Sequence, residues 1–190
     1  MGEKIERMKL LWTLQKENHI DLFFSDESGF QLVPNLPYGW QAKGKYVRML
    51  PRKGKNLSIF GLLSTDNRLV CYPTEQTTDA AFIIQCLDDF VKKINKPTVV
   101  IMDNAPIHRA KIMMDKRKEW EAKDLFIFFL PKYCPHLNRI ETLWRKIKYE
   151  WIKPKHYKSW RTFTKAVKSI LASFGSENYN INFSDPYYIA

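Results

Sequence analysis

Apolar residues follow two different patterns along the chain, and each pattern predicts a different kind of element. Short continuous apolar runs between turn residues are typical of buried strands. Such runs lie at 20–25, 56–64, 69–73, 98–102 and 125–130. Apolar residues three and four positions apart are typical of amphipathic helices. This spacing predicts helices at 3–17, 79–94, 109–122, from Asn138 to before Pro154, and from Ser159 to Gly175.

The connections between these elements refine the picture. The polar turn 65–68 joins the second and third strands into a hairpin. Thr77 or Thr78 is expected to cap the helix at 79–94. Segment 30–55 is rich in proline and glycine and predicts a long loop or loose hairpin. A hairpin followed by alternating helices and strands predicts an α/β fold, with a mixed five-stranded sheet flanked by helices on both faces.

Composition narrows the class of protein. The 190 residues predict one domain, and no apolar run is long enough to span a membrane. The net charge of +11 favours a polyanionic partner, and nucleic acid is favoured over an acidic membrane. The three cysteines form no C-x-x-C pair, which indicates a reducing compartment. A zinc site that includes Cys134 is disfavoured, because the usual ligand spacing is absent.

Three carboxylates lie where elements begin or end. Asp26 follows the strand at 20–25 and Asp103 follows the strand at 98–102, and ligands collect beyond the carboxyl ends of strands. Glu141 lies in the first turn of a helix, one turn before Arg145 and two before Lys148. Oxygen ligands of this kind suit magnesium or manganese. Two such ions can activate a water or hydroxyl and stabilise a leaving oxygen.

Each carboxylate also has a structural interpretation. Asp103 and Asn104 could cap the following helix. Asn138-x-x-Glu141 matches a capping box, and taken alone that interpretation is favoured. Asp26 alone is an ordinary strand-end residue. Glu27 is an alternative metal ligand, but if the strand continues it points to the opposite face.

Taken together, three motifs resemble those of DDE transposases of the mariner superfamily, in its bacterial insertion-sequence branch. They are Asp26-Glu27-Ser28, Asp103-Asn104-Ala105-Pro106-Ile107-His108, and Leu130-Pro-x-Tyr-x-Pro-x-Leu-Asn138-x-Ile-Glu141-x-x-Trp144. The segments Tyr38-Gly39-Trp40 and Lys43-Gly44 resemble that family's insertion after the first strand. The match covers about residues 20–153, and 38 positions separate the last two acids.

This resemblance implies a ribonuclease-H-like fold in which Asp26, Asp103 and Glu141 bind two Mg²⁺ ions, with Mn²⁺ as a substitute. It implies metal-dependent cleavage of double-stranded DNA at the transposon's inverted repeats. The freed 3′-hydroxyl would then attack target DNA, in a homodimer assembled on DNA. Asn104, His108 and Asn138 match positions beside the site, with roles in orientation or phosphate contact.

The resemblance also implies a domain organisation. Residues 20–153 are expected to form the catalytic domain with a clamp-like insertion at 30–55, after a linker helix at 1–19 and before a C-terminal helix and tail at 154–190. Relatives have an N-terminal helix-turn-helix region that reads the inverted repeat. Only 19 residues precede the first strand here, so repeat-specific binding by this chain alone is not expected.

Clusters of basic residues, in the insertion without any acidic residue between them, mark the expected DNA contacts. They are Lys43, Lys45, Arg48, Arg52, Lys53 and Lys55 in the insertion, and Arg145 and Lys148 in the helix after Asn138. Two other functions stay open: a different ribonuclease-H-like nuclease, and a decayed or co-opted DNA-binding protein. The expected location is the prokaryotic cytoplasm, at the nucleoid.

Overall fold

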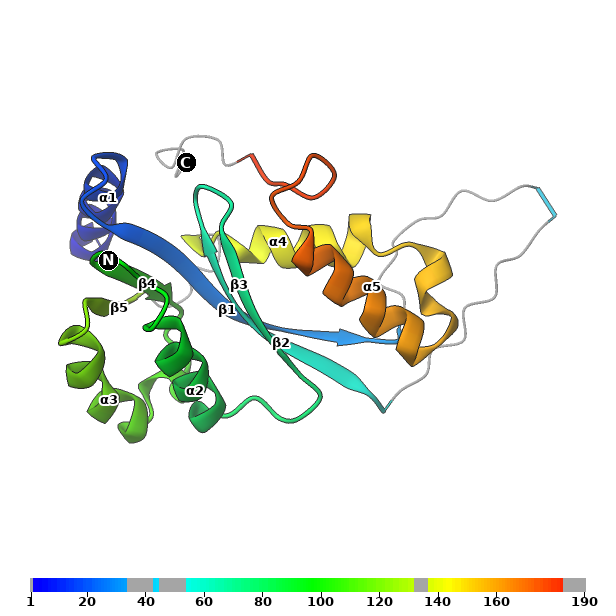
Figure 1. The fold of residues 1–190 in the computed structure, drawn as a ribbon, viewed down its shortest axis with the longest axis horizontal. Coiled ribbons are helices and arrows are strands. Elements are labelled where there is room, and N and C mark those ends of the chain that lie inside the picture. Colours follow the sequence, from blue (N-terminus) through cyan, green and yellow to red (C-terminus); the bar gives the residue numbers. More distant parts are fainter. Residues whose placement is uncertain (1, 34–42, 45–53, 132–136, 183–190) are drawn as a thin grey trace.

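Five strands form one mixed sheet in the computed structural model, which describes residues 2–33, 43–44, 54–131 and 137–182 (Figure 1). The strands are β1 (Asp21–Gln31), β2 (Asn56–Ser64), β3 (Leu69–Thr74), β4 (Thr98–Met102) and β5 (Leu125–Phe129). Their order is β3-β2-β1-β4-β5. The β1–β2 and β2–β3 pairs are antiparallel, whereas the β1–β4 and β4–β5 pairs are parallel. The mixed five-stranded sheet is therefore confirmed.

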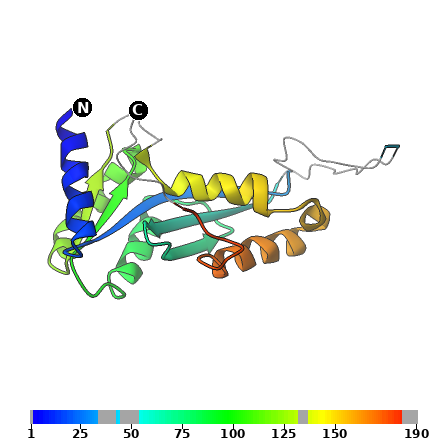
Figure 2. The same ribbon diagram turned by 90° about the horizontal axis from the view of Figure 1, so that it is seen from above.

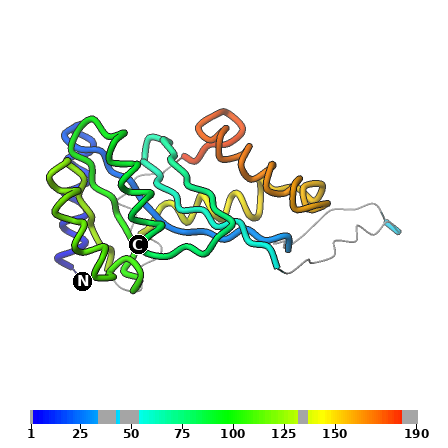
Figure 3. Tube along the Cα trace, turned by 60° about the horizontal axis from the view of Figure 1, so that its bottom comes forward, coloured from blue at the N-terminus to red at the C-terminus, as the bar shows by residue number. Residues whose placement is uncertain are grey.

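Helices cover both faces of the sheet, as expected. They are α1 (Gly2–Lys16), α2 (Ala80–Phe90), α3 (Lys111–Glu121), α4 (Ile140–Lys146) and α5 (Trp160–Ala172). Shorter helical turns are η1 (Pro106–Arg109), the π-helical η3 (Ile147–Trp151) and η4 (Pro154–Lys158). One apolar core joins the sheet to α2 and α3, which lie side by side (Figure 3), and the other joins it to α1, α4 and α5. None of the described helices is long and apolar enough to cross a membrane.

Alternation along β1 assigns its side chains to these two cores. Phe24 and Phe30 belong to the core beneath α1 and α4, and Phe23 belongs to the core beneath α2. Trp12 of α1 packs on Phe24 with ring centroids 5.7 Å apart. Even-numbered residues of β1 therefore face α4, and odd-numbered residues face α2.

Several expected boundaries were wrong, among them the end of the helix expected at 79–94, since α2 ends at Phe90. β1 does not end at Ser25, because its pairing with β2 continues to Gln31 opposite Asn56 although the residues between are mostly polar. The first residues of the expected loop at 30–55 are therefore strand, and Asp26 lies inside β1. The cap of α2 is Asp79, whose side chain accepts from the Phe82 N–H, rather than Thr77 or Thr78. The helix expected at 109–122 begins only at Lys111, after η1.

Candidate active site

Asp26 and Asp103 come together because their strands are parallel neighbours. The β1–β4 ladder ends with Phe24 opposite Ile101, and each acid lies two residues beyond that pair. The two strands run in the same direction, so both carboxylates lie at the same end of the parallel pair. This is the position at which open α/β sheets bind ligands.

Asn138 attaches the start of α4 to the strand that contains Asp26. Its side-chain amide donates to the carbonyl oxygen of Ser25 at 2.9 Å, and Asn138 is buried. Figure 2 shows α4 running along β1. The capping-box interpretation was wrong: α4 begins at Ile140 with no side-chain cap, and the amide nitrogen of Asn138 instead donates across the fold. The exposed Glu141 follows in the first turn of α4.

Close packing between β2 and α4 requires a glycine. Gly61 pairs with Asp26 in the neighbouring strand, and the Trp144 ring of α4 covers it. A Cβ atom at Gly61 would lie 2.7 Å from Trp144 and 3.0 Å from Ile140, closer than side chains normally approach. The missing side chain thus lets the helix that contains Glu141 come close to Asp26.

Negative charge accumulates around Asp26. Burial raises the pKa of its carboxyl group, the negative charge of Glu27 raises it further, and Glu141 and Asp103 add to the effect. The resulting pKa is about 7. All three predicted catalytic acids therefore interact electrostatically at this point. A cation placed there would offset both the burial and the repulsion.

His108 connects two acids from opposite sides of the site. Its Nδ1 lies 2.6 Å from Oδ1 of Asp103, and its Nε2 lies 2.9 Å from Oε1 of Glu27. Burial alone lowers the pKa of His108, but the two carboxylates outweigh it and raise the pKa to about 10. The hydrogen bond from His108 in turn lowers the pKa of Asp103. At neutral pH the ring is therefore a buried cation between two carboxylates.

The donor set fits a hard divalent cation, although the side chains do not form a closed cage. Asp26, Asp103 and Glu141 offer carboxylate oxygens, the ligands that Mg²⁺ and Mn²⁺ prefer. Among the described residues, no three acidic, histidine or cysteine side chains are gathered closely enough to hold a metal. A cation held by all three carboxylates would therefore require their side chains to rearrange. Asp103 also accepts from the Ala105 N–H at 2.9 Å, so it does stabilise its own loop.

Comparison with known proteins identifies the family of this chain. The family described as DDE superfamily endonuclease matches residues 21–164, which include all three acids. The chain belongs to the DDE superfamily endonucleases. An uncharacterised 39 kDa protein of insertion element IS630 from Shigella sonnei is 24% identical over 136 residues, which is 66% of this chain and 37% of that protein.

Solved structures show the same fold. The chain aligns with the Mos1 strand transfer complex at a TM-score of 0.58 and 17% identity, over 91% of this chain and 54% of that one. A Mos1 mariner paired-end complex with Mn gives 0.58 and 18%, over 90% and 54%. The fold of this DDE-family chain is ribonuclease-H-like, as expected. The chain spans about half the length of these relatives or less.

Several expected DNA contacts of the DDE-family chain can be located. Lys43 and Lys55 are exposed, and so is Arg145 on α4, whereas Lys45, Arg48, Arg52 and Lys53 lie outside the described residues, as do Cys134 and His136. Lys148 is half-buried in η3, and its Nζ lies 5.2 Å from the centre of the Phe30 ring. Burial lowers the pKa of Lys148, and the charge of Asp26 opposes that shift.

The residues expected beside the catalytic acids differ in solvent exposure. Asn104 is half-buried in the turn after β4, next to Asp103. His108 is only 1% exposed, so its ring is closed to a phosphate. Glu27 was expected only as an alternative ligand, and its bond to His108 was not anticipated. Finding that bond requires knowing that β1 continues past Asp26, which the polar residues after Asp26 do not indicate.

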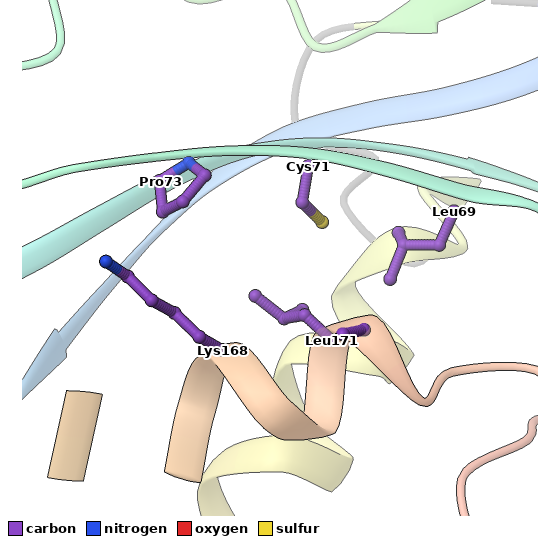
Figure 4. A pocket seen from close by; sticks show the side chains of 6 residues that line it. Leu69, Cys71, Pro73, Lys168 and Leu171 are labelled. Carbon is purple, nitrogen blue, oxygen red and sulfur yellow. The ribbon is translucent and has the colours of Figure 1, made fainter. Parts of the chain in front are cut away.

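An apolar groove lies apart from the carboxylates, between β3 and α5 (Figure 4). It has a volume of about 370 Å³ and is lined by Leu69, Cys71, Pro73, Lys168, Leu171 and Ala172. Cys71 pairs with Gly61, so β2 separates the groove from Asp26. No acid lines the groove, and it does not contribute to the metal site.

Removing the charge of Asp26 should stabilise the metal-free protein. Between pH 4 and 7 an unfolded aspartate ionises while the folded Asp26 stays protonated, so its contribution to stability is lost as the pH rises toward 7. Asp26→Asn cannot ionise. We expect its free energy of unfolding at pH 8, in EDTA, to exceed that of the wild type by roughly 2–4 kcal/mol. The difference should vanish near pH 4.

Urea denaturation at several pH values measures this difference. Glu27, Glu141, Asp103 and Lys148 also interact electrostatically with Asp26, so the informative quantity is the variant minus the wild type. Asp115→Asn, which removes an exposed aspartate of α3, is the control. A pH-independent difference for Asp26→Asn would show that its carboxylate carries no burial penalty.

Proposed function

We propose that this chain is the catalytic domain of a transposase. In this proposal it cleaves double-stranded DNA at transposon ends and joins the freed 3′-end to target DNA. Asp26, Asp103 and Glu141 would hold two Mg²⁺ ions, with Mn²⁺ as a substitute. Such ions would activate the attacking hydroxyl and stabilise the negative charge on the leaving oxygen.

The observation that carries the proposal is the convergence of charge on Asp26. Asp103 and Glu141 come from elements far apart in the sequence, yet both raise the pKa of Asp26. A fold gains no stability from gathering unneutralised acids, and such clusters are typical of functional sites. The match to DDE superfamily endonucleases and the manganese named for a Mos1 complex agree with this interpretation.

The domain organisation, the assembly on DNA and the cellular location belong to the same proposal. We assign the chemistry to residues 20–153, with 1–19 as a linker helix, 30–55 as a clamp and 154–190 as a C-terminal unit. The active form would be a homodimer assembled on DNA, at the nucleoid of a prokaryotic cell. Asn104 and Asn138 would orient the site, the latter through its bond to the Ser25 carbonyl oxygen.

Strand cleavage in vitro tests the function. The chain is incubated with supercoiled plasmid and with labelled duplexes that carry candidate inverted repeats, in Mg²⁺, Mn²⁺ or EDTA. We expect metal-dependent nicking that leaves 3′-hydroxyl ends. Cleavage of RNA–DNA hybrids alone would favour a different nuclease of this fold. DNA binding without any cleavage would favour a co-opted binding protein.

Two cations beyond Glu141 should contact the DNA backbone. We expect the double variant Arg145→Ala and Lys148→Ala to flatten the dependence of log affinity on log salt concentration by about 1–2 units, because each phosphate contact releases about 0.9 counterion. Fluorescence anisotropy with a labelled duplex, from 50 to 300 mM salt, measures the slope.

A matched double variant controls for overall charge. Lys111→Ala and Lys118→Ala remove the same charge from exposed positions of α3, on the opposite face of the sheet. Its slope should equal that of the wild type. Equal slopes for both double variants would remove Arg145 and Lys148 from the DNA-binding surface.

A further inference from the structure

Glu27 is an acid at the site for which the proposed chemistry has no use. It follows Asp26 in β1, and alternation turns it to the opposite face of the sheet, toward α2 and η1. There Oε1 of Glu27 lies 2.9 Å from Nε2 of His108. The other ring nitrogen of His108 lies 2.6 Å from Oδ1 of Asp103. A continuous side-chain link thus runs from β1 to the loop after β4.

We propose that Glu27, acting through His108, is a positioning residue that fixes Asp103 relative to Asp26 for binding of a divalent cation. This inference rests on the proposed function, because it concerns the same carboxylates. Glu27 itself does not touch the metal in this account. Its contribution is to the orientation of a ligand on the other side of the strand.

The backbone ladder leaves a gap that this link fills. Pairing between β1 and β4 ends with Phe24 opposite Ile101, two residues before each acid. Beyond that point, the connection between the two acids is through side chains. Glu27 is adjacent to Asp26 and His108 binds Asp103, so the link joins the two ligands through their immediate neighbours.

The hydrogen bonds that Asp103 accepts determine which of its two carboxylate oxygens can face a cation. Oδ1 accepts from His108 and from the Ala105 N–H at 2.9 Å, so this oxygen is held by two donors. The other oxygen, Oδ2, is left to face a cation. The Asp103 side chain is 48% exposed, whereas that of His108 is 1% exposed. The metal side of the carboxylate is therefore open, and its supporting side is closed.

Local structure fits His108 to this role. Pro106 begins the 3-10 turn η1, and the His108 N–H donates to the Ala105 carbonyl oxygen at 3.1 Å. The turn brings the ring back beneath Asp103, five residues earlier in the sequence. Partners that orient a ligating carboxylate in this way commonly contribute 10–100-fold to metal affinity.

Binding of Mn²⁺ to the full chain tests the link, with free Mn²⁺ followed by its EPR signal. Glu27→Ala removes the acceptor, and we expect it to weaken Mn²⁺ affinity about 10-fold or more. Glu27→Gln retains an acceptor oxygen for His108 and should lose less. Glu121→Gln, which removes the carboxylate paired with Arg117 on α3, is the matched control and should bind as the wild type does.

A double-mutant cycle separates positioning from general stability. His108→Asn keeps an N–H near the place of Nδ1 but cannot reach Glu27. In that background, Glu27→Ala should change Mn²⁺ affinity less than about 2-fold, since the residue acts through His108. An equal loss in both backgrounds would show that Glu27 acts by another route and would overturn the inference.

Asp103→Asn separates this inference from the proposed function. Wild-type Mn²⁺ affinity in Glu27→Ala, together with a loss in Asp103→Asn, overturns the positioning role alone. Wild-type affinity in Asp103→Asn overturns the proposed function itself. Circular dichroism verifies folding of each variant. If Glu27→Ala is unfolded, Glu27→Leu, which fills the space without offering an acceptor, replaces it, and an affinity equal to that of Glu121→Gln overturns the inference.

Discussion

Replacing Asp103 by asparagine should reduce DNA cleavage at least about 10³-fold, equivalent to roughly 4 kcal/mol of transition-state stabilisation. The substitution keeps the side chain's shape and leaves one oxygen for the Ala105 N–H. It removes the negative charge that pairs with His108 and that would hold a cation. Single-turnover cleavage of a labelled duplex in Mg²⁺ measures the loss.

DNA affinity should be unchanged in the same variant, because the basic residues that bind phosphates remain. Anisotropy in EDTA measures it without interference from cleavage. Asp115→Asn on α3 provides the matched control and should cleave as the wild type does. Equal cleavage by Asp103→Asn and the wild type would contradict the assignment of this site.

Gly61→Ala should have the second largest effect, although Gly61 has no side chain of its own. Its added methyl group would lie 2.7 Å from the Trp144 ring, so α4 or the indole must move. We expect about 1–3 kcal/mol of destabilisation from overpacking. Cleavage should fall on the order of 100-fold, because a displacement of about 1 Å at a catalytic group costs that much.

A compensating substitution tests whether the contact with Trp144 is the cause. The approaching atoms belong to the outer edge of the indole, which phenylalanine lacks. Trp144→Phe combined with Gly61→Ala should therefore recover part of the lost stability and cleavage. Gly2→Ala, at a position with nothing within 4 Å, is the control. No recovery in the double variant would place the defect elsewhere than in α4.

The strand patterns alone predicted that Asp26 and Asp103 lie close together, whereas Glu141 was singled out only by its place in a family motif. Asp103 follows a strand buried along its whole length, which marks the carboxyl end of a parallel strand. Asp26 was correctly placed near it, but for an incomplete reason, since β1 continues to Gln31. An apolar pattern cannot show this continuation, because backbone pairing with β2 supports the polar residues.

Contacts between distant segments could not be predicted in the same way. Asn138 has the spacing of a helix cap, yet its amide binds the Ser25 carbonyl oxygen, 113 positions away in the sequence. The link from Glu27 to His108 spans 81 positions and depends on the strand alternation and on a short 3-10 turn. Nothing in the sequence around Gly61 indicates that the indole ring of Trp144 covers it. Such contacts follow from how α4 and η1 pack on the sheet.

The most direct test is a crystal of this chain soaked in Mn²⁺, with the anomalous scattering of manganese used to locate the ions. The account predicts density between Asp26 and Asp103, with Glu141 rotated toward it and Oδ2 of Asp103 as the ligand atom. Density elsewhere would contradict the account. So would a manganese-soaked crystal in which the three carboxylates surround no metal.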